Sequence, residues 1–257
     1  MVQFQQSVGL LRSVVMYHGV PFRKRRMSRF YAQFIGAGDL CFDIGAHVGS
    51  RLSVWSRLGA RVIGVEPQPL CMRWLERRYG HLANVTLVEE AVGANPGMAT
   101  LLVSQRTPTV TTLSQDWIDS VRRARSFSTV QWDETVSVTV TTLDDLIDRY
   151  GEPAFCKIDV EGYELDVLQG LSRPIRALSF EYVVAAKEAA LDCVRYLKQL
   201  GAYEYNWSPG ESQEMQEPAW LGAEEMLAHL QGLPGDEGSG DVYARLLRAD
   251  LDQRREA

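Results

Sequence analysis

The amino-acid sequence predicts an α/β fold in which helices cover a mostly parallel sheet. Short apolar runs rich in β-branched residues alternate with stretches of helical periodicity, which is typical of βαβ units. A glycine-rich turn follows the first of these runs. With 46% hydrophobic and 23% charged residues, the composition is that of a globular protein that needs no disulfide or metal to build its core.

The first half of the pattern is regular. Residues 40–44 form an apolar run of strand length, and helical spacing follows over residues 48–58. The next apolar run covers residues 61–65 and precedes a second helical stretch at 68–79. Residues 85–89 form a third β-branched strand. These elements predict two consecutive βαβ units.

The pattern is less regular between residues 94 and 140, which are rich in Thr and Ser. We expect strands at 100–103 and 136–140 and a helix at 116–124. Because its periodicity is weak, we interpret this stretch as an insertion near the site and not as a separate domain.

Alternation resumes in the last part of the chain. We expect a strand at 155–159, a helix at 163–171, a strand at 177–182 and a helix at 185–200. Two closing strands are predicted at 203–207 and 242–247. The alternation therefore predicts one α/β domain over residues 34–248, followed by a polar tail at 249–257.

Residues 1–33 are predicted to be an N-terminal helical segment. Phe4, Val8, Leu11 and Val15 share one helical face, which we expect to pack against the domain. A lid, a dimer contact and a membrane-surface helix are the alternatives, so a homo-oligomer stays open.

Charge and cysteine content restrict the partners. The formal net charge of −6 argues against nucleic acid as a partner. No apolar stretch reaches the roughly 20 residues of a membrane span, and no secretory signal is expected. The basic run 23–26 is interpreted as a solvated loop before a helix, with a phosphate- or membrane-binding role as the alternative. Four scattered cysteines indicate a reducing compartment, and we expect a cytoplasmic protein.

The turn after the first predicted strand indicates a nucleotide site. It reads Asp43-Ile-Gly45-Ala46-His47-Val48-Gly49, at the strand end where α/β sheets bind ligands. A dinucleotide fold would show G-x-G-x-x-G, whereas the spacing here is G-x-x-x-G after an aspartate. A carboxylate at this position would repel a pyrophosphate but suits the ammonium and sulfonium of S-adenosylmethionine.

Acidic residues also end the next two predicted strands. Glu66 is positioned to accept the ribose hydroxyls, and Glu90 and Ala91 follow the third strand near the expected adenine. A helix N-cap or a surface charge explains any one acid, but acids at consecutive strand ends favour a nucleotide site.

A second cluster of carboxylates follows residues 155–159. Asp159 and Glu161 lie two residues apart, and Glu181 ends the following strand over the same crevice. These three residues are the predicted catalytic groups, because methyl transfer to a hydroxyl benefits from a nearby base. His47 is a weaker candidate, since a turn histidine often has no role. Three carboxylates also suit a divalent cation, but without histidine or a D-x-D pattern we expect no metal.

Two motifs together resemble the FkbM family of methyltransferases over residues 34 to 246. The matching segments are 38–49, Val65-Glu66-Pro67, 141–146, Lys157-Ile-Asp159-Val-Glu161-Gly-Tyr-Glu164, 167–170 and 240–245. The resemblance implies a Rossmann-like, seven-stranded sheet with the last strand antiparallel, and S-adenosylmethionine as methyl donor. It also implies acceptors that carry hydroxyls, such as sugars, polyketides or other natural products.

Carried over residue by residue, the resemblance implies a set of cofactor contacts, with Asp159 facing the methyl end. These are Asp43, Gly45, Ala46, Gly49, Glu66, Pro67, Glu90, Ala91 and Asp159. Residues 109–113 lie where the family often has a serine-rich loop, here built from threonines. The sequence therefore predicts an O-methyltransferase acting on a small molecule. A nucleotide-binding module without catalysis and a NAD-dependent oxidoreductase are the alternatives.

Overall fold

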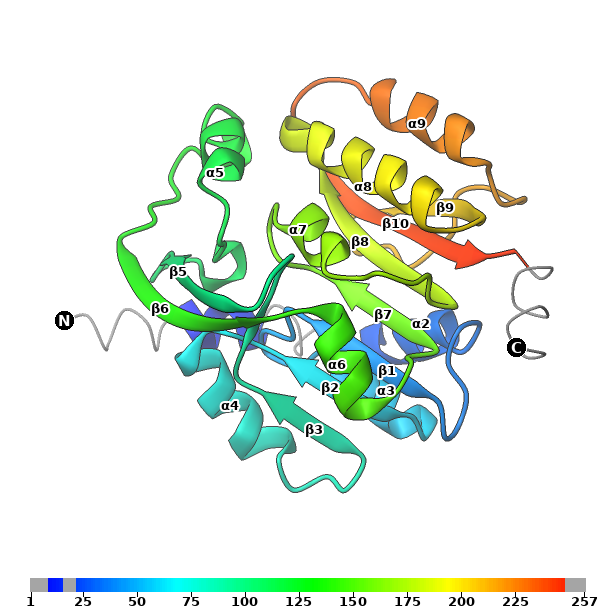
Figure 1. Ribbon diagram of the computed structural model, residues 1–257. Coiled ribbons are helices and arrows are strands. Elements are labelled where there is room, and N and C mark those ends of the chain that lie inside the picture. The colour runs from blue at the N-terminus through cyan, green and yellow to red at the C-terminus, as the bar shows by residue number, and fades with distance from the viewer. Residues whose placement is uncertain (1–8, 16–21, 248–257) are drawn as a thin grey trace.

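The computed structural model describes residues 9–15 and 22–247 of the chain (Figure 1). In this part of the chain the main sheet has seven strands in the order β3-β2-β1-β7-β8-β10-β9. Their bounds are Leu40–Ile44 (β1), Arg61–Val65 (β2), Val85–Val88 (β3), Phe155–Ile158 (β7), Ala177–Val183 (β8), Tyr203–Pro209 (β9) and Ser239–Leu246 (β10). The last strand, β10, runs antiparallel to both β8 and β9, and the other neighbours are parallel. The predicted fold is confirmed.

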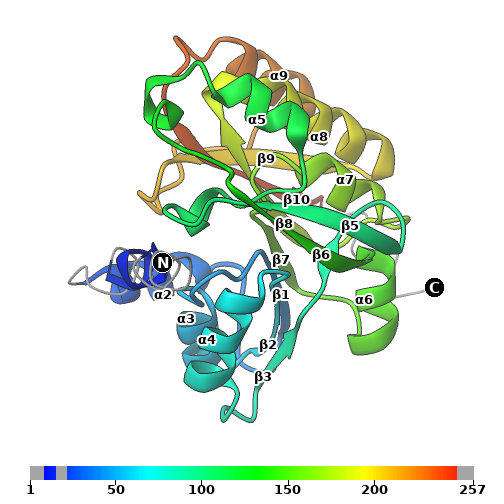
Figure 2. The same cartoon turned by 90° about the vertical axis from the view of Figure 1, so that its left-hand side faces the viewer.

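Helices cover both faces of this sheet (Figure 2). One face carries α2 (Arg23–Tyr31), α3 (Leu52–Trp55) and α4 (Pro69–Tyr79). The other carries α6 (Leu143–Tyr150), α7 (Glu164–Gln169), α8 (Lys187–Leu200) and α9 (Ala223–Gln231). Each face buries its own cluster of apolar side chains, so the strands are enclosed on both sides, as parallel sheets require.

A smaller sheet is built from the less regular stretch of the sequence. It contains β4 (Ala91–Val92), β5 (Gly97–Val103) and β6 (Glu134–Thr141), with β6 in the middle. Between β5 and β6 the chain forms α5 (Gln115–Val121). This sheet has a small apolar cluster of its own, centred on β5 and β6.

The largest difference from the predicted elements is the helix expected at 48–58. The α-helix covers only Leu52–Trp55 and continues as a 3-10 turn, Ser56–Leu58. The chain before it is a turn in which Gly45, His47 and Gly49 all have positive φ angles. A helix cannot include such residues. The structure also contains two helices, α6 and α9, at positions where the sequence pattern predicted none.

The N-terminal expectations are partly wrong. Leu11 and Val15 have 63% and 61% of their surface exposed, so they do not pack on the domain as predicted, while Phe4 and Val8 lie outside the described residues. The basic run 23–26 is the first turn of α2 and not a loop before it. Within the described ranges, no helix combines the length and apolar character needed to cross a membrane.

Candidate active site

A cavity opens at the carboxyl ends of β1, β2 and β7, beneath the loop that follows β5. The space between its walls, including the part that is open to solvent, is about 840 Å³. The predicted site residues that line it are Gly45, Ala46, Glu66, Pro67, Glu90, Ala91, Asp159 and Glu161. Asp43 and Gly49 are not among the lining residues, and Glu181 lines a smaller cavity of about 220 Å³.

Gly45 forms the floor of the larger cavity. Its φ angle is +80°, and a Cβ there would overlap the carbonyl oxygen of Asp159. The N–H groups of Gly45 and Ala46 donate to the carbonyl of Val65, at 2.9 and 3.0 Å. Glycine is therefore required here both by the backbone conformation and by the close approach of the neighbouring strand end.

Gly49 has a different role. Its φ angle is +75°, and a Cβ there would overlap the ring of Tyr79 and crowd Leu75. Both of these residues belong to α4. The second glycine of the turn thus lets a helix pack closely and does not face the cavity.

Glu66 is buried at the end of β2, and backbone groups hold its carboxylate. The N–H groups of His47 and Gln68 donate to its two oxygens at 2.8 and 2.9 Å. Burial raises the pKa of Glu66 to about 7, although these two hydrogen bonds act in the opposite direction. Each carboxylate oxygen can accept a further hydrogen bond. The geometry therefore fits a ligand with two adjacent hydroxyls, such as a ribose.

Threonines from the loop after β5 close the cavity. The Thr111 hydroxyl is buried without a hydrogen-bond partner among the described residues, and Thr111 lines the cavity. The Thr112 hydroxyl donates to the backbone carbonyl of Glu161 at 2.6 Å. A buried hydroxyl without a hydrogen-bond partner is costly, so the Thr111 hydroxyl is suited to bind a polar group of a ligand. Glu90, at the other end of the cavity, forms an ion pair with Arg149 at 2.8 Å.

Arg51 was not predicted from the sequence. Its guanidinium donates to Asp43 at 2.6 Å and to the carbonyl of Gly45 at 3.2 Å, and it forms an ion pair with Asp159 at 3.0 Å. It thus joins the end of β1, the glycine turn and the end of β7. The available signal was a cation at the N-cap of a helix, where the helix dipole disfavours positive charge.

Lys157 continues this network towards β10. Its ammonium group is buried, 3.5 Å from Asp159 and 2.7 Å from Asp241. Burial by itself would raise the pKa of Asp159, but the cations of Lys157 and Arg51 outweigh it and hold the pKa below its usual range. Asp159 is therefore a stable carboxylate, which holds a proton only weakly.

Glu161 and Glu181 differ from Asp159. Burial, followed by the neighbouring carboxylates, raises the pKa of each well above its usual range. Glu161 also has a φ angle of +55°, a strained conformation for a residue with a side chain.

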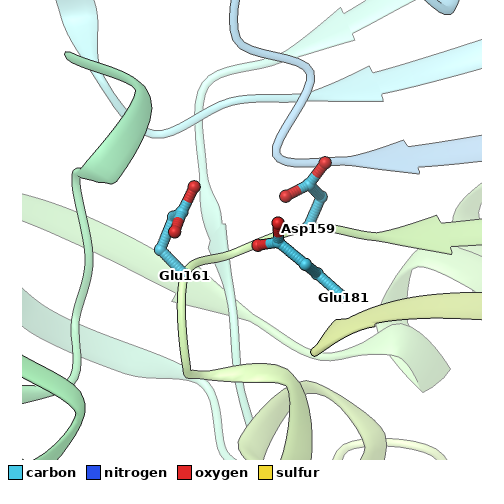
Figure 3. Close-up of side chains that lie close together, drawn as sticks. All are labelled: Asp159, Glu161 and Glu181. Carbon is cyan, nitrogen blue, oxygen red and sulfur yellow. The ribbon is translucent and has the colours of Figure 1, made fainter. Parts of the chain in front are cut away.

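Figure 3 shows the carboxyl groups of Asp159, Glu161 and Glu181 turned towards a common space. Each offers an oxygen within 4.8 Å of the others. Three such oxygens also suit a divalent cation, so the expectation that no metal binds stays a prediction.

Comparisons with solved structures match several methyltransferases at low sequence identity. The precorrin-6y C5,15-methyltransferase of Geobacter metallireducens is 12% identical, with 85% of this chain and 87% of that chain covered and a TM-score of 0.46. An rRNA methylase from Streptococcus thermophilus is 11% identical, with coverages of 86% and 94% and a TM-score of 0.43. An S-adenosylmethionine-dependent O-methyltransferase from Thermotoga maritima is 10% identical, with coverages of 87% and 66% and a TM-score of 0.41. No curated protein sequence matches the chain significantly.

The methyltransferase FkbM domain matches residues 43–203, more than half of the chain. This range contains both motifs on which the resemblance was based, the glycine turn after β1 and the carboxylate cluster after β7. The chain therefore belongs to the FkbM methyltransferase family, and it is an enzyme that uses S-adenosylmethionine as its methyl donor.

Proposed function

We propose that the enzyme methylates a hydroxyl oxygen of a small molecule and that Glu161 is the base that takes the hydroxyl proton. The observation that carries this proposal is the position of the carboxylates between two cavities. Asp159 and Glu161 line the larger cavity, whereas Glu181 lines the smaller one. A donor in the larger cavity and an acceptor in the smaller one would meet beside these groups.

As its side chains stand, the smaller cavity has room for only about one water-sized group, so it admits no more than the hydroxyl end of an acceptor. Its walls include aromatic and small apolar side chains, namely Trp117, Tyr182, Val183, Ala186, Ala189 and Ala190. The Trp117 ring lies directly against Gly162, so it is close to the proposed base. Because the carboxyl groups of Glu164 and Glu181 also line this cavity, it favours a polar group such as a hydroxyl, presented towards Glu161.

The pKa directions favour Glu161 over Asp159 as the base. A carboxylate whose pKa is held low by two cations is a weak proton acceptor, whereas a raised pKa brings a carboxyl group closer to the ideal for a base at neutral pH. Glu161 and Glu181 disfavour each other's ionisation, so the pair can share one proton. The proposed role of Asp159 is to provide a fixed negative charge beside the donor's sulfonium.

When bound, S-adenosylmethionine supplies an electrophilic methyl group on a positively charged sulfur. Glu161 would accept the hydroxyl proton as the acceptor oxygen bonds to the methyl carbon and the carbon–sulfur bond breaks, and the proton would then pass to solvent. The products are a methyl ether and S-adenosylhomocysteine. Glu66, Thr111 and the glycine turn hold the donor in the larger cavity. Positioning of this kind contributes roughly 7–11 kcal/mol to lowering a barrier.

A Glu161→Gln variant tests the proposed base. Hydroxylated acceptors are screened for methylation, and the best one is then used with the variant. Since a positioned base contributes about 10²–10⁴ in rate, kcat should fall by that factor. The dissociation constant for S-adenosylhomocysteine, measured by calorimetry, should change by less than about twofold, a free-energy difference under 1 kcal/mol.

Glu76→Gln, on the exposed surface of α4, is the matched control and should retain full activity. Undiminished turnover of Glu161→Gln would remove this residue as the base. Methylation of amines but of no hydroxyl compound would contradict oxygen as the acceptor atom. Failure of the wild-type protein to bind S-adenosylhomocysteine would contradict the assignment of the larger cavity.

Metal-assisted methylation is a second candidate, favoured by the three carboxylate oxygens within 4.8 Å of one another. In that mechanism the cation would bind the acceptor hydroxyl and promote loss of its proton. We expect instead that dialysis against EDTA leaves turnover unchanged. Loss of activity that Mg²⁺ restores would identify Asp159, Glu161 and Glu181 as metal ligands.

A further inference from the structure

The basic run at the start of α2 is divided between two faces of the helix. Arg23 forms an ion pair with Glu211 at 2.8 Å, and Arg26 donates to the Glu211 carbonyl at 3.1 Å and to Gln213 at 3.4 Å. These two arginines, three residues apart, fasten α2 to the loop after β9. Their positive charges thus have a structural role.

The other face of the helix is different. Lys24, Arg25 and Arg29 line a groove together with Arg57, which comes from the 3-10 turn after α3. Figure 2 shows α2 and α3 next to each other on the same side of the sheet. The groove is completed by Ser28, Ala32, Val54 and Leu58.

The described residues of the groove offer no carboxylate to balance this charge. The residues that line the groove include no Asp or Glu, and none of its four cations forms an ion pair within the described part of the chain. The pKa of Lys24 is lowered by partial burial and by the nearby charges of Arg57 and Arg78. This concentration of like charge contrasts with the formal net charge of −6 for the whole chain. Such a concentration of positive charge attracts anions to the groove.

We propose that the groove between α2 and α3 is a binding site for a soluble ligand that carries phosphate groups. Three guanidinium groups and one ammonium group provide many donors for phosphate oxygens, and arginine binds such oxygens in a bidentate manner. A single carboxylate would balance only one of the four charges, whereas a diphosphate balances most of them. The apolar side chains Ala32, Val54 and Leu58 leave room beside the phosphates for a non-polar part of the ligand.

Calorimetric titration of the full chain with inorganic pyrophosphate, at low and at physiological salt, tests this site. The key variant is Arg29→Glu with Arg57→Glu, since both side chains are exposed and their replacement does not disturb the core. Wild-type protein should bind pyrophosphate, and the variant should bind at least about tenfold more weakly because two charge-assisted contacts are lost. Both proteins should bind S-adenosylhomocysteine equally, which separates this site from the methyl-donor cavity.

The matched control is Arg123→Glu with Arg176→Glu. These two exposed arginines lie in loops elsewhere in the chain, and their replacement changes the net charge by the same amount. This control should bind pyrophosphate as the wild type does. Equal weakening in both double variants would mean that only net charge matters and would overturn the proposal. So would the absence of binding to wild type at low salt. The proposal would also be overturned if the protein co-sedimented with phosphatidylglycerol vesicles but did not bind pyrophosphate. That result would indicate that the groove binds a membrane surface.

Discussion

The two ends of the larger cavity satisfy their polar groups in different ways. At the nucleotide end, backbone N–H groups hold the Glu66 carboxylate, and the segments involved lie between Gly45 and Gln68. At the chemistry end, charged side chains hold one another, and they come from positions as distant as Arg51 and Asp241. The hold on the Glu66 carboxylate is local in the sequence, whereas the charge network exists only after the whole sheet has formed.

This difference determines how each end should respond to mutation. Backbone donors remain when a side chain is replaced, so the nucleotide end is sensitive mainly to residues that shape the turn. In the charge network, Asp43, Arg51, Asp159, Lys157 and Asp241 alternate in sign, and each neutralises its neighbours. Removal of one member leaves a buried charge unbalanced, which is among the most costly single changes in a folded protein.

The largest effect is expected for Arg51→Gln. It leaves the carboxylate of Asp43, whose side chain has 0% of its surface exposed, without its cation. We expect the free energy of unfolding at pH 7 to fall by about 3–5 kcal/mol in urea denaturation. Without Arg51, burial keeps the folded-state pKa of Asp43 above its unfolded value, so the deficit should shrink as the pH falls and the carboxyl group becomes protonated.

Arg195→Gln is the matched control, since Arg195 and Asp192 are also 2.6 Å apart but have 46% and 47% of their side-chain surfaces exposed. An exposed pair contributes at most about 1 kcal/mol, so this variant should be nearly as stable as the wild type. Adding Asp43→Asn to Arg51→Gln should recover part of the lost stability. Equal, small effects of the two arginine replacements would show that the buried network does not hold the chemistry end together.

A smaller but still large effect is expected for Gly45→Ala, which tests the nucleotide end. The added Cβ would overlap the Asp159 carbonyl, and alanine does not favour a φ angle of +80°. We expect a loss of about 3 kcal/mol in unfolding free energy and no measurable binding of S-adenosylhomocysteine. Gly97→Ala is the control, since a Cβ at Gly97 would have no atom within 4 Å and the φ angle there is ordinary. Retained affinity in Gly45→Ala would contradict the role of the turn.

The same contrast explains what could be predicted from the sequence. The strands, the turn at Gly45 and the acid at Glu66 are marked by local patterns, and each lies where expected. Arg51 has no such pattern, because its partners Asp43 and Asp159 are brought to it by the pairing of β1 with β7. Asp43 is predicted to contact the cofactor; in the structure it is not among the residues that line the cavity, and its carboxylate pairs with Arg51. The sequence shows that Asp43 is acidic, but it does not show that Arg51 is its partner.

The smallest predicted effect concerns the pH dependence of ligand binding at Glu66. Its pKa of about 7 means that the carboxyl group is mostly protonated at pH 6 and mostly ionised at pH 8. Ribose hydroxyls donate to the ionised form, so binding is favoured by loss of the proton. The affinity for S-adenosylhomocysteine should therefore weaken by about tenfold between pH 8 and pH 6, as measured by calorimetry.

Variants of Glu66 and His47 show which residue causes the pH dependence of binding. Glu66→Gln should bind about 1–3 kcal/mol more weakly at pH 8 and should lose most of the pH dependence, because its amide does not titrate. His47 lines the same cavity and its backbone N–H holds the Glu66 carboxylate, so His47→Gln is the necessary control and should keep the dependence. If His47→Gln abolishes the dependence and Glu66→Gln does not, the titrating group is the histidine. In that case the carboxylate held by backbone N–H groups would not govern binding at the nucleotide end, and the contrast with the chemistry end would no longer hold.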